Sequence, residues 1–184
     1  MALKSTVYKV ELHLADMDHQ AYQQHNLTLA RHPSETTERL MVRLLAFVLL
    51  AHQAPDAACA LIFGKGLSSE DEPDLWQKDL TGAIQLWVEV GLPSEKAIRQ
   101  ACGRSRQVVV LPYGGRVADM WWQQNSKALL KSANLTVINL PDTQDIGAII
   151  ERNTQLSCSI EDEVLQLSHA GGIREIAPQF LKRP

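Results

Sequence analysis

The stretch that decides the fold runs from residue 84 to residue 91 and reads Ile-Gln-Leu-Trp-Val-Glu-Val-Gly. Every second residue from Ile84 to Val90 is aliphatic, which predicts a β-strand with one face against a hydrophobic core. The other face carries Trp87 and Glu89. A tryptophan on this second face indicates that it is covered as well, so the strand is expected to lie inside the protein with a packed layer on each side.

Helix and strand patterns alternate on both sides of this strand. The expected elements are a helix over about 35–52, a hairpin of 74–78 with 84–90, a helix over 94–102 with Gly103 just past its end, a strand over 107–111, a helix over about 117–131 and a strand over 135–140. Strands that alternate with helices imply at least one parallel pair joined by a crossover. The fold class is therefore α/β (α+β), a mixed β-sheet flanked by helices.

Further strands are expected near both ends of the chain. Residues 5–14 and 26–31 alternate as strands, and residues 155–160 and 164–168 form a hairpin. Ser34 is the expected N-cap of the long helix. Asp142 is expected to begin a short helix that ends near Glu151. The type of the apolar segment 60–63 stays undetermined, and the whole chain, 1–184, is expected to form a single domain.

Composition places the protein among ordinary globular chains. It has 184 residues, of which 45% are hydrophobic and 21% charged, enough for one domain with a sizeable core. The start of the sequence lacks the pattern of a signal peptide, and the longest apolar run, 44–51, is too short to cross a membrane. The three cysteines form no CxxC pair and are expected to be reduced. These features predict a cytoplasmic protein with no membrane contact.

Charge is distributed unevenly along the chain. Residues 70–95 hold seven acidic residues and one basic residue, whereas residues 96–131 hold seven basic residues and one acidic residue. This order is compatible with a metal site beside a phosphate-attracting rim, and equally with two solvated faces that neutralise each other. The net charge of −3 argues against strong non-specific binding of nucleic acid.

Asp74 and Glu89 are the residues most suggestive of chemistry. A two-residue turn at 81–82 places Asp74 directly opposite Glu89, whereas a four-residue loop places it opposite Trp87, with Glu89 as a diagonal neighbour. In both registers the two carboxylates are expected to share a face, where like charges are unfavourable unless a cation lies between them. Oxygen ligands suit Mg²⁺ or Mn²⁺. The alternative is an exposed hairpin end at which water screens the pair.

The long helix offers a third carboxylate. Glu38 belongs to a row of the helix that continues through aliphatic residues, so it is expected to point toward the core. There it either stabilises the start of the helix or reaches a metal site beside the sheet. Glu35, Arg39 and Arg43 form a second row of alternating charge, which we interpret as a solvated stripe.

These residues resemble the core of the PD-(D/E)XK nucleases, with an acid on a first helix, then Pro73-Asp74, then Glu89 on the next strand. Four longer segments are similar to the bacterial YaeQ family, which is regarded as a variation on that nuclease fold without an established activity. The segments are Leu-Ala-Arg-His-Pro-Ser-Glu-Thr (29–36), Asp-Glu-Pro-Asp-Leu-Trp (71–76), Val-Glu-Val-Gly-Leu-Pro (88–93) and Trp-Trp-Gln-Gln-Asn (121–125). The resemblance runs from the start of the chain to about Ser168. It implies a nuclease-like core at about 34–140 with extra N- and C-terminal strands.

The resemblance implies a nuclease or phosphodiesterase that uses Mg²⁺, or Mn²⁺, on DNA or RNA. The implied metal ligands are Asp74, Glu89 and the carbonyl of Val90, and the implied catalytic residues are Glu38, Asp74, Glu89, Lys96 and Arg99. The nuclease pattern has a lysine two residues after the strand acid, where this chain has Gly91. Lys96 or Arg99, on the following helix, is expected to supply the missing positive charge.

Two other functions stay open at this point. The first is a catalytically inactive protein of the nuclease fold that associates with nucleic acid, or with proteins of transcription or repair. The substitution of Gly91 for the usual lysine and the net acidic charge favour it. The second is a domain that binds a protein partner through the helix that carries Trp121 and Trp122, since adjacent helical residues cannot both face the core.

Overall fold

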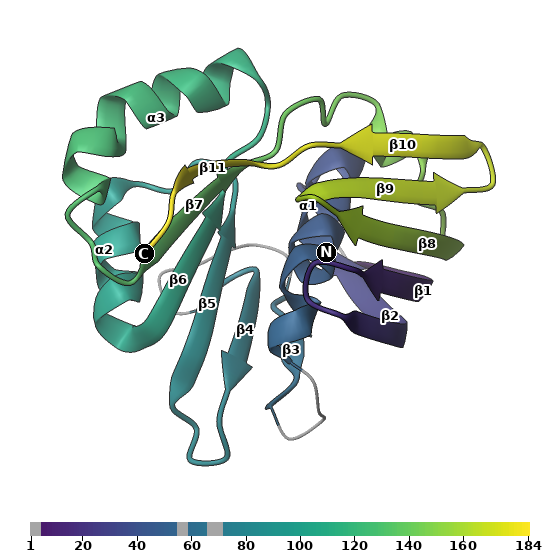
Figure 1. The fold of residues 1–184 in the computed structure, drawn as a ribbon, viewed down its shortest axis with the longest axis horizontal. Helices are drawn as coiled ribbons and strands as arrows, with labels where there is room; N and C mark the ends of the chain where they lie inside the picture. The colour runs from purple at the N-terminus through teal and green to yellow at the C-terminus, as the bar shows by residue number, and fades with distance from the viewer. Residues whose placement is uncertain (1–4, 55–58, 66–71) are drawn as a thin grey trace.

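Two β-sheets and three α-helices make up the part of the chain that this computed structural model describes, residues 5–54, 59–65 and 72–184 (Figure 1). The five-stranded sheet has the order β10-β9-β8-β1-β2 and consists of β1 (Thr6–Asp16), β2 (Ala21–Arg31), β8 (Asn153–Glu161), β9 (Val164–His169) and β10 (Gly172–Ile176). The six-stranded sheet has the order β11-β7-β6-β5-β4-β3 and consists of β3 (Leu61–Phe63), β4 (Leu75–Lys78), β5 (Ile84–Val90), β6 (Ser105–Leu111), β7 (Leu135–Asn139) and β11 (Gln179–Lys182). The helices are α1 (Thr37–Leu50), α2 (Glu95–Arg104) and α3 (Arg116–Leu129), with 3₁₀ turns η1 (Ala51–Gln53) and η3 (Ile146–Ala148).

Helix α1 lies between the two sheets, as Figure 1 shows. From Leu40 to Leu50 only Leu49 is not buried, and the helix shares one hydrophobic core with β1 and β8 of one sheet and with β5 of the other. Helices α2 and α3 cover the opposite face of the six-stranded sheet, where Ile98 and Trp121 share a second core with Trp87. Strand β5 is therefore covered on both faces, as its sequence predicted.

The fold class expected from the sequence is confirmed, because β5, β6 and β7 are parallel neighbours joined by helical crossovers. The strands expected at 5–14, 26–31, 155–160 and 164–168 do not extend that sheet, although β11 does by pairing with β7. The expected strands form a second sheet, in which β1 pairs in parallel with β8 and antiparallel with β2. The reason lies in α1, which is apolar on almost all sides and needs an apolar layer on each of them.

The predicted start of the first helix is wrong by two residues. Thr36, not Ser34, is the N-cap, and its hydroxyl accepts a hydrogen bond from the backbone N–H of Arg39 at 3.1 Å. Glu35 consequently precedes the helix instead of opening it. Helix α2 ends at Arg104, so Gly103 lies inside the helix and does not follow it.

The short helix expected from Asp142 to Glu151 is also absent; this segment holds only the single turn η3. Asp142 and Asp145 have φ angles of 54° and 62°, which no α-helix contains. The turn packs directly on the start of α1. A Cβ added at Gly147 would lie 2.7 Å from the backbone nitrogen of Glu38, so the close approach requires glycine there.

The adjacent residues Trp121 and Trp122 differ in burial, as expected. Trp121 is buried and its indole N–H donates to the Pro93 carbonyl at 2.9 Å, while Trp122 is only partly buried against the same core. Among the helices of the described residues, none is long and apolar enough to span a membrane.

Candidate functional site

The hairpin of β4 and β5 adopts the register expected for a two-residue turn over most of its length. Leu75 pairs with Val88, Trp76 with Trp87 and Gln77 with Leu86. A bulge after Gln77 then shifts the register, so that the connecting loop is longer than two residues. The side chain of Asp79 holds this loop by accepting hydrogen bonds from backbone N–H groups inside it.

Asp74 lies at a bend directly before β4 and is only 1% exposed. Its backbone N–H donates to the Val88 carbonyl at 3.0 Å, and its own carbonyl accepts from Gly64 at 2.8 Å. One carboxylate oxygen, Oδ2, accepts a hydrogen bond from the backbone N–H of Val90 at 2.7 Å. The side chain is thus anchored on the edge of β5 and directed toward α1.

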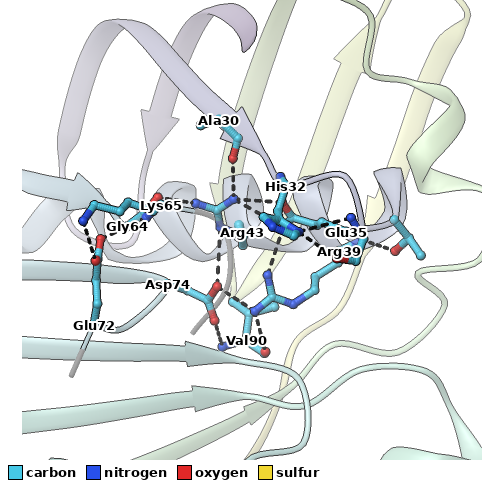
Figure 2. A network of polar contacts seen from close by, with 12 residues as sticks. Ala30, His32, Glu35, Arg39, Arg43, Gly64, Lys65, Glu72, Asp74 and Val90 are labelled. Carbon is cyan, nitrogen blue, oxygen red and sulfur yellow. Dashed lines mark hydrogen bonds and ion pairs between the residues drawn. The ribbon is translucent and has the colours of Figure 1, made fainter. Parts of the chain in front are cut away.

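Two arginines of α1 meet the other oxygen of this carboxylate (Figure 2). Arg39 donates to Oδ1 at 2.7 Å, and the Nε of Arg43 lies 3.5 Å from the same atom. Both arginines also pair with Glu35, at 2.9 Å and 3.2 Å respectively. Two positive and two negative groups therefore form a compact network of balanced charge, and the carboxylates of Glu35 and Asp74 are fully buried in it.

This network, which we call the α1 arginine network (Glu35, Arg39, Arg43 and Asp74), connects the two sheets. The guanidinium of Arg43 donates to the carbonyl of Ala30 in β2 at 3.2 Å and to that of Gly64, beyond β3, at 2.8 Å. Burial acts to lower the pKa of Arg39, but the charges of Asp74 and Glu35 outweigh it, so that this pKa is raised. Arg39 therefore remains charged, and the network serves as a structural cross-link.

Glu89 lies on the opposite face of the six-stranded sheet. It alternates with Val88 and Val90, which belong to the core shared with α1, and is 7% exposed. Its Oε1 accepts a hydrogen bond at 2.7 Å from the indole N–H of Trp87, which packs in the core under α2 and α3. The expectation that the carboxylates of Asp74 and Glu89 share a face is therefore wrong, because the bend at Asp74 turns its side chain toward α1.

The other predicted site residues are dispersed around this sheet edge. Glu38 is half-buried and accepts a hydrogen bond from the Thr143 hydroxyl at 2.7 Å. Lys96 and Arg99 are exposed on α2, and Arg99 pairs with Glu95 at 3.7 Å. The carbonyl of Val90, predicted as a metal ligand, lies 3.5 Å from the guanidinium of Arg39.

The backbone explains the glycine that replaces the expected lysine. Gly91 has a φ angle of +108°, a conformation that strains any residue with a side chain. Strand β5 ends here, and the chain turns toward α2. A lysine at this position would destabilise the turn, so its absence follows from the local fold.

This arrangement does not fit a magnesium ion held between Asp74 and Glu89. The Asp74 oxygens are already engaged by two guanidiniums and a backbone N–H, and Glu89 faces the other side of the sheet. In the described part of the chain, the one group of three or more His, Cys, Asp or Glu residues close enough to share an ion excludes both of them, and Glu38 too.

The sequence interpretation missed that Glu35, Arg39 and Arg43 form an interior network and not a solvated stripe. Arg43 has no exposed surface at all. A signal was present, because Arg43 stands in the middle of the apolar run from Leu40 to Leu50, and a helix apolar on all sides leaves no solvated face. Its charge could then be accommodated only by buried acids.

The architecture and the network together define a class of protein: a mixed α+β fold in which a buried helix joins two sheets through paired arginines and carboxylates. Comparison with known proteins identifies the family within that class. The YaeQ protein family model matches residues 1–178, and the chain belongs to this family.

Similar proteins extend over nearly the whole chain. The uncharacterised YaeQ proteins of Escherichia coli (strain K12) and Salmonella typhi are 42% and 41% identical to it, over 91% and 100% of this chain and 91% and 99% of their own lengths. The crystal structure of YaeQ from Xanthomonas axonopodis pv. citri matches with a TM-score of 0.90 at 44% identity, covering 98% of this chain and 99% of that one. That of YaeQ from Pseudomonas syringae matches with a TM-score of 0.88 at 32% identity, covering 98% and 97%.

Proposed function

We propose that this protein binds nucleic acid through the layer formed by α2 and α3, without cutting it. The observation that carries the proposal is the concentration of exposed positive charge on that layer. Five of the residues concerned lie on α2 and α3, while Arg106 is at the start of β6 and Lys131 just beyond α3. All seven are exposed, and we call them the basic layer: Lys96, Arg99, Arg104, Arg106, Arg116, Lys127 and Lys131.

The charge of this layer contrasts with that of the rest of the chain. Residues 95–131, from the start of α2 to just past α3, hold seven basic residues and two acidic residues, a net +5, whereas the whole chain has a net charge of −3. The remaining residues therefore carry a net −8. Such a separation orients a polyanion toward one side of the molecule and repels it from the others. The modest total charge does not prevent binding, because the attraction is local.

Non-polar side chains accompany the charges on the same layer. Val117 and Met120 of α3 are 59% and 48% exposed, and Leu130, just beyond it, is 58% exposed. Exposed apolar groups between lysines and arginines are suited to unstacked bases, while the charged groups are suited to phosphates. Single-stranded RNA or DNA is accordingly the preferred ligand in this proposal.

We propose that the protein does not cleave nucleic acid, because the acidic residues expected to catalyse cleavage make other contacts. Asp74 is neutralised by Arg39 and Arg43, and Glu89 faces away from it. The backbone at Gly91 disfavours the lysine of the nuclease pattern. The rival function is the Mg²⁺- or Mn²⁺-dependent phosphodiesterase, with Asp74 and Glu89 as metal ligands.

Fluorescence anisotropy with labelled single- and double-stranded oligonucleotides of mixed sequence tests the binding. We expect dissociation constants of roughly 1–100 µM near physiological salt. If about four phosphates of a single strand are contacted, raising the salt from 50 to 200 mM weakens binding by roughly 50-fold. The double substitution Arg116→Glu with Lys127→Glu should reduce that salt effect to roughly 7-fold, because two contacts are lost.

A matched control reverses the same number of charges outside the basic layer. Lys9 and Lys65 are both exposed, one on β1 and one after β3, so Lys9→Glu with Lys65→Glu changes the net charge equally. Equal weakening by the two double variants would contradict the proposal. Incubating the same oligonucleotides with Mg²⁺ or Mn²⁺ tests the rival: cleavage that is lost in Asp74→Asn and in Glu89→Gln would establish the phosphodiesterase instead.

A further inference from the structure

A second buried aspartate lies at the far end of α1, in surroundings unlike those of Asp74. Asp16 is the last residue of β1 and has no exposed surface. Its neighbours are His19, from the turn between β1 and β2, and His52, from η1 at the end of α1. Two segments of the chain, the end of β1 with its following turn and the end of α1, thus bring a carboxylate and two imidazoles to one point.

Distances between the potential donor atoms are already short. Oδ2 of Asp16 lies 2.9 Å from Nδ1 of His19 and 3.7 Å from Nδ1 of His52. One donor atom from each residue can be chosen so that all three lie within 4.8 Å of one another. Ligand bonds of 2.0–2.2 Å in a tetrahedral site put donor atoms roughly 3.3 Å apart. Two of the observed separations bracket that value.

The local contacts leave this cluster short of positive charge. The other oxygen of Asp16, Oδ1, accepts a hydrogen bond from the backbone N–H of His19 at 3.0 Å, which orients the carboxylate. Nδ1 of His52 is buried without a hydrogen-bond partner among the described residues. Where Asp74 meets two guanidiniums, Asp16 meets two imidazoles, and a buried carboxylate needs a compensating cation.

The two imidazole rings are parallel, so their in-plane nitrogen lone pairs do not meet at one point, and a shared ion requires one ring to turn. They stack with centroids 3.6 Å apart and an interplanar angle of 4°. Burial, and next the neighbouring His19, lower the pKa of His52, while Asp16 and the Leu49 carbonyl act in the opposite direction. An uncharged imidazole is the form that binds metals. His19 is half-exposed on a turn, so its ring can rotate to complete the ligand geometry.

A cavity of about 490 Å³ opens beside the cluster, between the two sheets. Asp16, His19 and His52 line it, together with polar side chains of the six-stranded sheet, Gln107 and Thr136. Metal sites with three protein ligands characteristically leave a fourth position for water or a small ligand. Here that position would face the cavity.

We propose that Asp16, His19 and His52 bind a divalent transition metal of the zinc type, with one coordination position open to this cavity. Two nitrogen donors and one oxygen donor are the set that Zn²⁺ prefers, whereas Mg²⁺ and Ca²⁺ prefer oxygen alone. The site is separate from the basic layer and does not depend on nucleic-acid binding.

Titration of the metal-stripped full chain with Zn²⁺ by calorimetry, and with Co²⁺ by visible absorption, tests the proposal. We expect one equivalent to bind, with the visible bands of four-coordinate Co²⁺. Because changing even an outer partner of a ligand costs 10- to 100-fold in affinity, His52→Ala and Asp16→Asn should each weaken binding by about 100-fold or more. His13→Ala is the matched control, since His13 is an exposed histidine of β1 outside the cluster. The metal affinity of this variant should equal that of the parent protein.

Several outcomes would overturn the proposal. One is equal affinity in the parent protein and both cluster variants, when urea unfolding shows that the variants are folded. Another is a thiolate charge-transfer band in the Co²⁺ spectrum, which would assign the metal to a cysteine. A third is no binding tighter than the millimolar range, which would leave Asp16 and His19 as an ordinary ion pair.

Discussion

Two buried aspartates at opposite ends of α1 show how the same side chain is accommodated in two ways. Asp74 is 1% exposed and Asp16 is fully buried, so neither charge is solvated. Asp74 is compensated by arginines, which stay ionised at every accessible pH, whereas Asp16 meets two imidazoles, a group whose charge depends on pH. The difference suggests that permanent partners mark a structural site and titratable partners a site able to exchange its cation.

The largest effect is expected from Arg43→Met, which removes the fully buried member of the α1 arginine network. Two carboxylates and the carbonyls of Ala30 and Gly64 then lose a donor. Removing one partner of a buried ion pair costs about 3–5 kcal/mol in the free energy of unfolding. Urea denaturation measures this. The exposed control, Arg116→Met, should change stability by less than about 0.5 kcal/mol.

The next effect in size is expected from Asp74→Asn. The asparagine oxygen can still accept a hydrogen bond, but the charge that balances Arg39 and Arg43 is lost. Hydrogen bonds to charged groups contribute about 1.5–3 kcal/mol, so a loss of this size in unfolding free energy is expected. A variant more stable than the parent would contradict this, because it would mean that Asp74 suffers repulsion, as an empty metal site does.

Asp16→Asn should have a smaller effect in the absence of metal. The substituted side chain can keep the hydrogen bond from the backbone N–H of His19, and no permanent cation is left unpaired. We expect a loss of about 1 kcal/mol in unfolding free energy, measured in the presence of a chelator. If Asp16→Asn lowered the free energy of unfolding as much as Asp74→Asn does, the two aspartates would be equivalent and the distinction drawn between them would be wrong.

The smallest effect concerns pH and His52. Because the pKa of His52 is lowered in the folded protein, the unfolded chain binds the proton more tightly. The stability that the neutral ring contributes is present above its unfolded pKa of 6.5 and is lost as the pH falls below that value. In metal-free protein, His52→Gln should therefore reduce the decline of unfolding free energy between pH 7.5 and 5.5.

A parallel substitution separates this effect from that of any half-buried histidine. Burial also lowers the pKa of His25, which packs edge-on against Phe47. His25→Gln should thus flatten the same pH profile, but it should leave Zn²⁺ binding unchanged. If His25→Gln and His52→Gln both abolished binding, the metal would not be held by the Asp16 cluster.

Most secondary structure was predictable because it depends on local periodicity. The alternation from Ile84 to Val90 predicted a strand covered on both faces, and the structure confirms it. The prediction of helix ends from capping residues was less reliable. Ser34 and Thr36 are both good N-caps, but in the structure Thr36 caps the helix and the Ser34 hydroxyl bonds to the ring of His32. The apolar character of α1 is evident in the sequence, and it leaves Arg43 inside the protein.

The register of the hairpin that carries Asp74 and Glu89 was predictable, but the direction of the Asp74 side chain was not. Asp74 and Glu89 do lie at neighbouring strand ends, as expected from the hairpin register. A bend of one residue before β4 then turns the Asp74 carboxylate toward α1, and no periodicity predicts such a bend. The cluster of Asp16, His19 and His52 joins the turn after β1 to the end of a helix more than thirty residues away. No spacing in the sequence indicates that pairing.

The sequence by itself determined the class of fold, the family, the strand covered on both sides and the segregation of basic residues into 96–131, because each is recorded in local patterns or in similarity along the chain. Only the tertiary structure decided which acids face cations and which face imidazoles. The reason is physical: the charge state and the chemistry of a buried carboxylate depend on partners a few ångströms away, and folding brings these partners from distant parts of the chain.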